Sequence, residues 1–225
     1  EKGLNEMNAL AVEVPEDEPW KAPNVAKLDA MSTAAWIASL QVPDAVKAAM
    51  MINQVSDNGQ AAEKQSLLGQ LAAVKGGQLE KFWTDSEVYR CKGGNSMLAR
   101  KLAEGIGAER IILGLQARSV KTKGDGLVVE ARDGRTIECD DVVLAVPPTM
   151  WKKIDCGLPD AMKPQMGLNA KYLSHVKARF WEKTDPKRSQ YALSDGLIQQ
   201  TWDGTDAQEK GEGGCLIGFA GGPPC

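Results

Sequence analysis

A short apolar run that ends at two prolines constrains the fold more than any other feature of this chain. Residues 141–146 read Asp-Val-Val-Leu-Ala-Val, and Pro147-Pro148 follow directly. The five consecutive apolar residues leave no polar face for solvent, so the run predicts a strand that is buried on both faces, as in a parallel sheet. Such a strand needs layers packed on both of its sides, which favours an α/β fold.

Helices are predicted for most of the first ninety residues, and strands for much of the rest. Apolar side chains recur at helical spacing in three segments, which begin near Ser32, Asp44 and Gln60. Farther on, Asp133-Gly134 between two alternating segments is typical of a β-hairpin. Long alternating segments after residue 170 predict further strands. The chain is therefore predicted to combine α and β elements with more than one sheet.

Composition argues against several classes of function. A formal charge of −3 over 225 residues gives no general attraction for nucleic acid. No apolar run approaches the roughly 20 residues that a membrane-spanning helix needs. His175 is the single histidine, which disfavours zinc sites with several histidines and histidine-dependent triads. The five scattered cysteines form no CxxC pair, which predicts reduced thiols and a cytoplasmic location.

A glycine pair, Gly93-Gly94, precedes the helix predicted for residues 96–104. The pair could let backbone N–H groups approach an anion, or it could simply form a turn that enters the helix. No GxGxxG motif follows a predicted strand, and the similar Gly105-Ile106-Gly107 ends a helix instead. The residue patterns alone therefore identify no complete nucleotide-binding site.

An ordered series of short segments runs along the chain. It comprises Pro19-Trp20, Leu28-Asp29 and residues 91–99, 118–120, 133–134, 143–148, 171–181, 194–196, 201–203 and 218–222. In order and spacing these segments resemble the flavin-containing amine oxidase family, which includes monoamine, polyamine and L-amino-acid oxidases. The family's N-terminal strand–GxGxxG–helix and its C-terminal FAD segment do not occur in the sequence. We therefore interpret the chain as the central part of a longer oxidase.

The resemblance implies two interleaved domains. Residues 1–91, mostly helical, and residues 161–225 would form a substrate-binding domain, in which a mixed sheet has a helical cover. Residues 92–160 would form the middle part of a Rossmann-like FAD-binding domain. The strands after residue 170 would then form the floor of the substrate cavity.

The resemblance also implies roles toward the flavin. Lys171 resembles the family lysine that holds a water against flavin N5, a catalytic role in which an ammonium favours negative charge on the reduced flavin. The alternative is a strand lysine with an exposed ammonium. Several other positions resemble residues that bind the cofactor, by their backbones or near the domain crossing: Gly93, Gly94, Val120, Ala145, Val146 and Pro147.

Three further positions resemble substrate-facing residues. Glu87 stands where monoamine oxidases carry an amide, and a carboxylate there could pair with the ammonium of a diamine or of an amino acid with a second charge. The alternative for Glu87 is a surface ion pair with Arg90. Phe82 and Trp83 match apolar residues of the cavity, although adjacent aromatic residues more often belong to a core.

The expected function is that of the central portion of an FAD-dependent amine or amino-acid oxidase. Such an enzyme oxidises a C–N bond to an imine and reduces O2 to H2O2. The 225-residue chain alone is expected to be inactive and to bind FAD weakly or not at all. Two alternatives are a relative of flavin desaturases or protoporphyrinogen oxidase, and a flavin-free interaction module. The expected partner is a small amine or amino acid, and a homodimer is left open.

Overall fold

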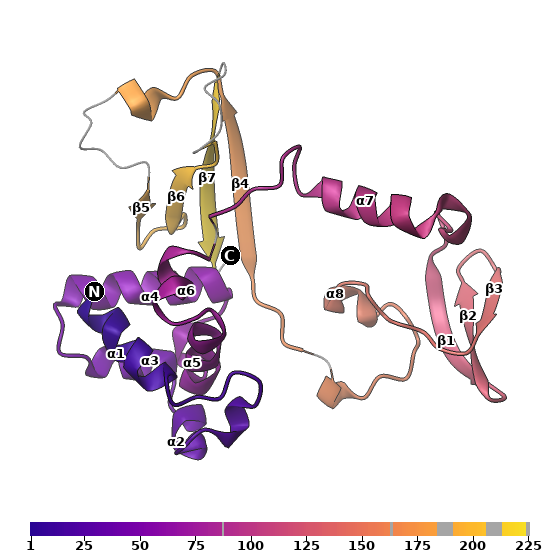
Figure 1. Cartoon of the computed structure of the whole chain (residues 1–225), viewed down its shortest axis with the longest axis horizontal. Helices are drawn as coiled ribbons and strands as arrows, with labels where there is room; N and C mark the ends of the chain where they lie inside the picture. Colours follow the sequence, from indigo (N-terminus) through magenta and orange to yellow (C-terminus); the bar gives the residue numbers. More distant parts are fainter. Residues whose placement is uncertain (87, 163, 184–190, 206–212, 224–225) are drawn as a thin grey trace. The chain divides into compact units, whose positions relative to one another are not determined.

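The computed structural model describes residues 1–86, 88–162, 164–183, 191–205 and 213–223 (Figure 1). The chain forms two compact units, Glu1–Glu87 with Gly167–Cys225, and Val88–Met166. The predicted domain boundaries lie close to these limits, at residues 91/92 and 160/161. Each unit has its own sheet together with helices, which confirms the mixed α and β class. Within the described ranges, no helix is long and apolar enough to cross a membrane.

The first unit starts with a layer of helices. They are α1 (Lys2–Ala11), η1 (Pro19–Lys21), α2 (Val25–Ala30), α3 (Thr33–Ser39), α4 (Asp44–Asn58), η2 (Ala62–Lys64), α5 (Leu67–Gly76) and α6 (Glu80–Thr84). The side chains of Ser32 and Ser66 cap α3 and α5, because each accepts a backbone N–H of the first turn. Apolar side chains of α1, α3 and α5 are fully buried, among them Met7, Ile37 and Leu71. Burial of each such side chain contributes about 1.5–3 kcal/mol, so this layer has a true core.

A four-stranded sheet completes the first unit. Its strands are β4 (Asn169–Val176), β5 (Ala192–Leu193), β6 (Gln200–Asp203) and β7 (Gly214–Gly221), in the order β4-β7-β6-β5. Every ladder of this sheet that the structure describes is antiparallel, so the predicted mixed sheet is wrong in that respect. Parallel neighbours need a long crossover, usually a helix. Between the described strands of this sheet the structure has only the short turn η5 (Phe180–Lys183).

Helix α4 packs across one end of this sheet (Figure 1). The Asn169 side chain donates a hydrogen bond to the carbonyl of Ser56 at 2.5 Å. The backbone N–H of Leu168 donates to the carbonyl of Gly59, which ends the helix in a left-handed conformation, at 2.7 Å. These contacts place the last turn of α4 beside the ends of β4 and β7.

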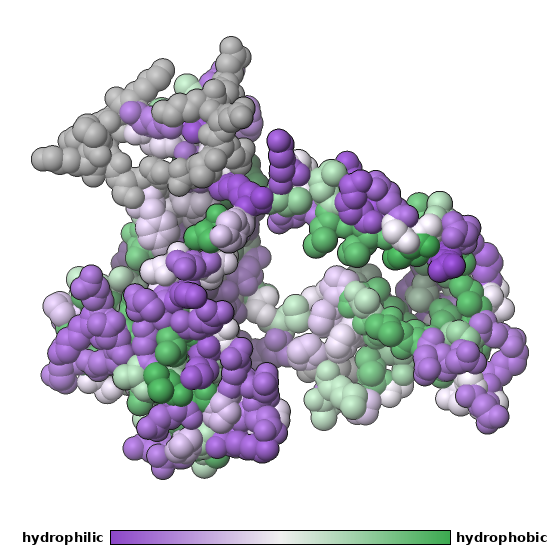
Figure 2. Space-filling model, in the orientation of Figure 1, coloured by the Kyte–Doolittle hydropathy of each residue, from purple (hydrophilic) through white to green (hydrophobic). Residues whose placement is uncertain are grey.

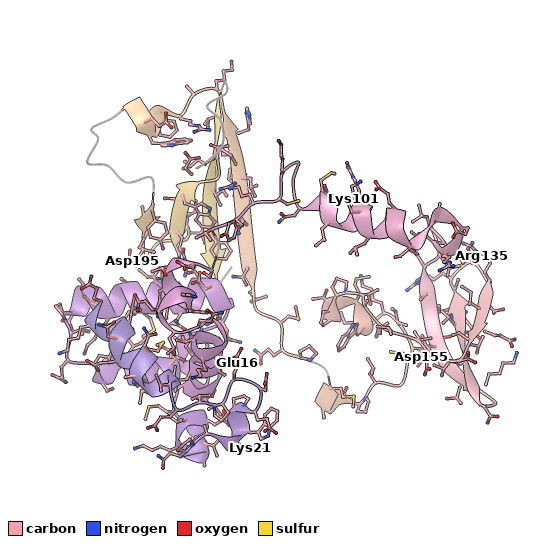
Figure 3. The ribbon with its side chains drawn as sticks, viewed as in Figure 1. Glu16, Lys21, Lys101, Arg135, Asp155 and Asp195 are labelled. Carbon is pink, nitrogen blue, oxygen red and sulfur yellow. The ribbon has the colours of Figure 1, made fainter. Side chains whose placement is uncertain are left out.

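In its described residues, the second unit has a three-stranded meander, two α-helices and two short 3-10 helices. It contains α7 (Ser96–Ile106), η3 (Ala108–Arg110), β1 (Ala117–Lys123), β2 (Gly126–Ala131), β3 (Thr136–Cys139), α8 (Pro148–Trp151) and η4 (Asp160–Met162). Gly134 has a φ of +88° between β2 and β3, which confirms the hairpin predicted at Asp133-Gly134. The carboxylate of Asp133 pairs with Arg135 in the same turn, and Figure 3 labels Arg135 there.

The strand predicted for residues 141–146 does not form. These residues have no ladder partner in the described part of the chain, and the side chain of Val143 is 89% exposed. The prediction is wrong because an apolar run becomes a buried strand only where neighbouring strands supply its hydrogen bonds. The described sheet of this unit has the order β1-β2-β3, and no strand follows β3 at that edge.

Candidate functional site

Lys171 lies on β4, which is at one edge of the four-stranded sheet as described. It stands opposite Phe219 of β7, and Phe219 in turn stands opposite Gln200 of β6. Directly opposed residues of antiparallel strands place their side chains on the same face. Trp202, two residues after Gln200, shares that face because side chains alternate along a strand. One face of the sheet therefore carries Lys171, Phe219, Gln200 and Trp202.

The ammonium of Lys171 is held by aromatic rings. Its Nζ lies 5.1 Å from the centroid of Trp202 and 5.1 Å from that of Phe219. The two rings contact each other edge to face, with centroids 5.8 Å apart. A cation–π contact at an exposed site is worth about 0.5–1 kcal/mol. The described part of the chain offers Lys171 no carboxylate partner, so its charge is available to a ligand.

Trp202 and Phe219 are site residues that sequence reasoning missed. Both stand in segments that carry the family resemblance, but no pattern in the sequence relates them to Lys171. They approach it only through the register of three strands that are far apart in the chain. Alternation of apolar and polar residues predicts which side chains share a face of one strand, but it does not predict which strands pair or in which register. A single sequence therefore could not predict that Trp202 and Phe219 lie beside Lys171.

A polar network lies next to the aromatic cluster on the same face of the sheet. The buried side chain of Gln200 donates through Nε2 to the Ser56 hydroxyl, and to Asp57 Oδ1 at 2.8 Å. Tyr191 donates its hydroxyl to Gln200 Oε1 at 3.3 Å. Burial raises the pKa of Tyr191, and the negative charge of Asp57 raises it further. The last turn of α4 and strand β6 thus meet through hydrogen bonds at this point.

A buried carboxylate holds the far end of β6. Asp203 accepts hydrogen bonds from Trp181 Nε1 at 2.9 Å, from the Thr205 backbone N–H at 2.7 Å and from the Thr205 hydroxyl at 2.6 Å. Burial raises the pKa of Asp203, but these hydrogen bonds and the nearby Arg179 charge outweigh burial, so its pKa lies below the ordinary value. This network fixes the strand that carries Trp202.

The glycine pair forms a turn at the start of α7. Gly93 and Gly94 have φ values of +86° and +90°, and the Gly94 N–H donates to the carbonyl of Cys91 at 2.9 Å. Nothing lies within 4 Å of the position that a Cβ of Gly94 would take. The positive φ values explain why glycines occupy this turn, and the space where a Gly94 side chain would lie is open.

The other predicted cofactor residues lie in the second unit. The backbone N–H of Val120 donates to the carbonyl of Asp155 at 2.9 Å, so this donor is already occupied; Figure 3 labels Asp155 beside β1. Ala145, Val146 and Pro147 are exposed and belong to no strand among the described residues. The Val146 carbonyl accepts a hydrogen bond from Trp151 Nε1 at 2.9 Å.

Of the three predicted substrate residues, the structure describes Phe82 and Trp83 but not Glu87. Phe82 and Trp83 contact each other edge to face at 4.7 Å and pack against the helical core. Trp83 Nε1 also donates to Asn8 Oδ1 of α1 at 2.8 Å. The described contacts of Phe82 and Trp83 are thus with helices, which favours the alternative that this pair belongs to the core. Glu87 lies outside the described residues.

Comparisons with known proteins assign the family. The pattern of the family described as flavin containing amine oxidoreductase matches residues 3–224. Flavin-containing amine oxidase A of Equus caballus is 27% identical over 205 residues, an alignment that covers 80% of this chain and 36% of the relative. Putrescine oxidase of Kocuria rosea is 24% identical over 242 aligned positions, covering 97% of this chain and 50% of the relative.

Solved structures with the same fold belong to similar enzymes. A triple mutant of putrescine oxidase superposes with a TM-score of 0.82 at 21% identity, over 99% of this chain and 51% of that one. Cyclohexylamine oxidase from Brevibacterium oxydans gives a TM-score of 0.78 at 22% identity, over 98% of this chain and 51% of that one. This chain thus spans about half the length of the chains in these structures. It spans a smaller share, 36%, of the amine oxidase A relative. Because the family pattern covers residues 3–224, the chain belongs to the flavin-containing amine oxidoreductases.

Proposed function

We propose that this chain provides the substrate-binding part of an FAD-dependent oxidase that acts on an amine or amino acid. The observation that carries the proposal is the Lys171 ammonium held over Trp202 and Phe219 on one face of the sheet. The names of the relatives, amine oxidase A and putrescine oxidase, support an amine as the substrate. The overall reaction converts an amine and O2 into an imine and H2O2, and the imine then hydrolyses in water.

FAD, when bound, supplies the acceptor for the two electrons that leave the C–N unit. The residues of this chain supply the surroundings. The Lys171 ammonium can donate hydrogen bonds to a water and stabilise negative charge that develops beside it. The rings of Trp202 and Phe219 present an apolar surface beside the ammonium. Exclusion of water favours the neutral form of a substrate amine, whose lone pair is needed for the formation of the C=N bond.

The residues present fit a flavin only in part. The open space beside Gly94 and the exposed segment at Ala145, Val146 and Pro147 are compatible with a cofactor that lies against them. The N–H of Val120 is already occupied by Asp155, so Val120 would have to offer its carbonyl or give up this bond. Residues 145–147 belong to no strand among the described residues, so no neighbouring strand fixes their backbone for a ligand. We therefore expect this chain alone to bind FAD weakly or not at all.

Absorbance spectroscopy tests both parts of the proposal. FAD is titrated into the 225-residue chain and into a protein extended at both ends to the length of its relatives. The longer protein should show the shifted, structured visible bands of bound flavin and should release H2O2 when an amine is added. A flavin-loaded preparation of the short chain would contradict the expected weak binding. A longer protein that binds flavin but produces no H2O2 with any amine would overturn the proposed reaction.

The role of Lys171 is tested by Lys171→Met in the extended, flavin-bound protein. We expect a loss in kcat of about 100-fold, because preorganised electrostatic stabilisation of developing charge is typically worth that much. Folding should be little affected, since a cation–π contact of an exposed lysine contributes about 0.5–1 kcal/mol. Lys177→Met, which removes an exposed lysine just past β4, is the matched control. Equal kcat values for the two variants would exclude a catalytic role for Lys171.

A further inference from the structure

A pocket of about 280 Å³ opens in the helical layer of the first unit. Its lining comes from α1, α2, α3 and α5 and from the segments that connect them, and no described residue of the sheet takes part. Apolar side chains form most of its surface: Val14, Ala22, Leu28, Met31, Trp36 and Leu67. The pocket is therefore separate from the sheet face that carries Lys171.

The walls of this pocket are held in place by the core of the helical layer. Val14, Trp36 and Leu67 are 1%, 7% and 1% exposed, and all three belong to the buried core. The backbone N–H of Leu67 donates to the carbonyl of Met31 at 2.9 Å, which ties α5 to the end of α2. A preformed apolar pocket requires little ordering when a ligand enters, so it favours binding.

The volume of the pocket limits the size of its ligand. An apolar cavity of about 150 Å³ can hold one benzene ring. The pocket, at about 280 Å³, is nearly twice as large. It can therefore accommodate a ring or a branched aliphatic group together with a short polar group.

Two opposite charges line the pocket. Glu13, which follows α1, and Lys27 of α2 both have exposed side chains. Neither forms an ion pair with another residue in the described part of the chain. A ligand that carries an ammonium and a carboxylate can pair with both. A simple amine or a simple carboxylate would instead meet one opposite charge and one like charge.

The indole N–H of Trp36 adds a hydrogen-bond donor to this lining. Trp36 is 7% exposed, and its side chain donates to no acceptor among the described residues. Its N–H is not one of the fully enclosed, unpartnered side-chain atoms of the described chain, so it keeps contact with open space. Because Trp36 lines the pocket, a ligand bound there can supply the missing acceptor.

We propose that this pocket binds a free amino acid with an apolar side chain, as its zwitterion. The apolar side chain enters the pocket, the ammonium pairs with Glu13, and the carboxylate accepts hydrogen bonds from Lys27 and from Trp36 Nε1. The site is additional to the surface around Lys171, since its lining comes from the helical layer alone. Its occupation requires neither flavin nor the proposed oxidation of an amine.

Isothermal titration of L-phenylalanine into the 225-residue chain tests this proposal. We expect saturable binding at one site. The affinity should be about 3- to 10-fold lower for 2-phenylethylamine, which lacks the carboxylate, and for 3-phenylpropionate, which lacks the ammonium, because each loses one charged partner. Glycine, which lacks the apolar side chain, should bind at least about 10-fold more weakly. Absence of saturable phenylalanine binding, or equal affinities for the three phenyl compounds, would overturn the proposal.

Variants of the two charged residues test the assignment to this pocket. Glu13→Gln and Lys27→Gln should each weaken phenylalanine binding about 3- to 10-fold, and both exposed positions tolerate the change without loss of the fold. Glu16→Gln, at a position that Figure 3 labels, and Lys64→Gln remove exposed charges outside the lining and are the matched controls. Equal losses in the controls and in the pocket variants would show an effect of net charge and contradict the assignment.

Nuclear magnetic resonance of isotope-labelled indole N–H groups locates the ligand. The chain has six tryptophans, and Trp36→Phe identifies the Trp36 signal as the one that is lost. This signal should shift as phenylalanine saturates the chain, and it should shift equally in Lys171→Met. If Lys171→Met abolishes binding, or if only the signal of Trp202 shifts, the ligand lies near Lys171 and the second site is excluded. Because the measurement needs no flavin, its outcome is independent of whether the extended protein oxidises an amine.

Discussion

At the scale of single residues, the hydrogen bonds of Asp203 explain how β6 is held in place. Its carboxylate is buried and accepts hydrogen bonds from Trp181 and Thr205. The pKa of Asp203 is lowered in the folded chain from the ordinary value of 3.8. A lowered folded pKa contributes stability above the unfolded pKa, and this contribution is lost as the pH falls through the folded pKa. Asp203 therefore stabilises the first unit at neutral pH and not in strong acid.

We expect Asp203→Asn to lower the free energy of unfolding at pH 7 by about 1–3 kcal/mol, because its donors lose a charged acceptor. The difference between Asp203→Asn and the unaltered chain should shrink as the pH falls below 3.8, where the carboxylate of the unfolded chain is protonated. Urea unfolding at several pH values measures both effects. The control is Asp195→Asn, at an exposed position that Figure 3 labels near β5. A difference that does not vary with pH would contradict the argument from charge.

The site residues differ in how far the sequence could predict them. The family resemblance pointed to Lys171, and the structure places it in a strand beside two aromatic rings. Trp202 and Phe219 could not be assigned, because their approach to Lys171 depends on strand pairing across the sheet. Asp57 could not be predicted either, because only the structure shows that its carboxylate accepts a hydrogen bond from Gln200 of β6.

At the scale of elements, the contact between α4 and β7 depends on Gly221. A Cβ at this position would lie 2.2 Å from the carbonyl oxygen of Ser56 and 2.7 Å from its Cα. Both atoms belong to the backbone of α4, so they cannot move aside as a flexible side chain would. The absence of a side chain at Gly221 therefore lets the helix approach the sheet closely enough for Asn169 to bind its last turn.

Gly221→Ala should destabilise the first unit by about 1–3 kcal/mol or more, the usual cost of overpacking a close contact. Gly218→Ala on the same strand is the matched control, since its Cβ would meet Ile198 Cγ2 at an ordinary 3.4 Å. Thermal unfolding followed by circular dichroism compares the two variants. Similar midpoints would show that α4 can withdraw from β7 without cost, in contradiction to the close packing argued above.

Helices and hairpins could be predicted from the sequence more reliably than strands that need distant partners, and the reason is physical. Elements specified by local chemistry, such as the helix after Pro43 and the hairpin at Asp133-Gly134, form as predicted. The strand at residues 141–146 does not form, because its hydrogen bonds would have to come from neighbouring strands. A helix satisfies its own backbone groups, whereas a strand depends on partners that are distant in sequence.

At the scale of the whole molecule, the two units differ in how well they bury apolar side chains. The helical layer of the first unit encloses a continuous core, while Ala131 is the only buried hydrophobic residue described in the second unit. Leu98, Leu102 and Ile106 of α7 are 67%, 59% and 50% exposed, and Figure 2 shows hydrophobic residues along this helix. Spaced at four-residue intervals, they form an apolar stripe on one face of the helix.

An exposed apolar stripe of this kind favours association with other apolar surfaces, so we expect the chain to bind a hydrophobic dye and to self-associate as its concentration rises. The double variant Leu98→Glu with Leu102→Glu should weaken both effects while helix content by circular dichroism is retained, since both side chains are already more than half exposed. Arg100→Glu adds an acidic residue to the same helix but leaves the apolar stripe intact, and it should behave like the unaltered chain. Dye fluorescence and light scattering across a concentration series compare the three proteins. Equal dye binding by the double variant and the control would mean that the stripe is not the surface that associates.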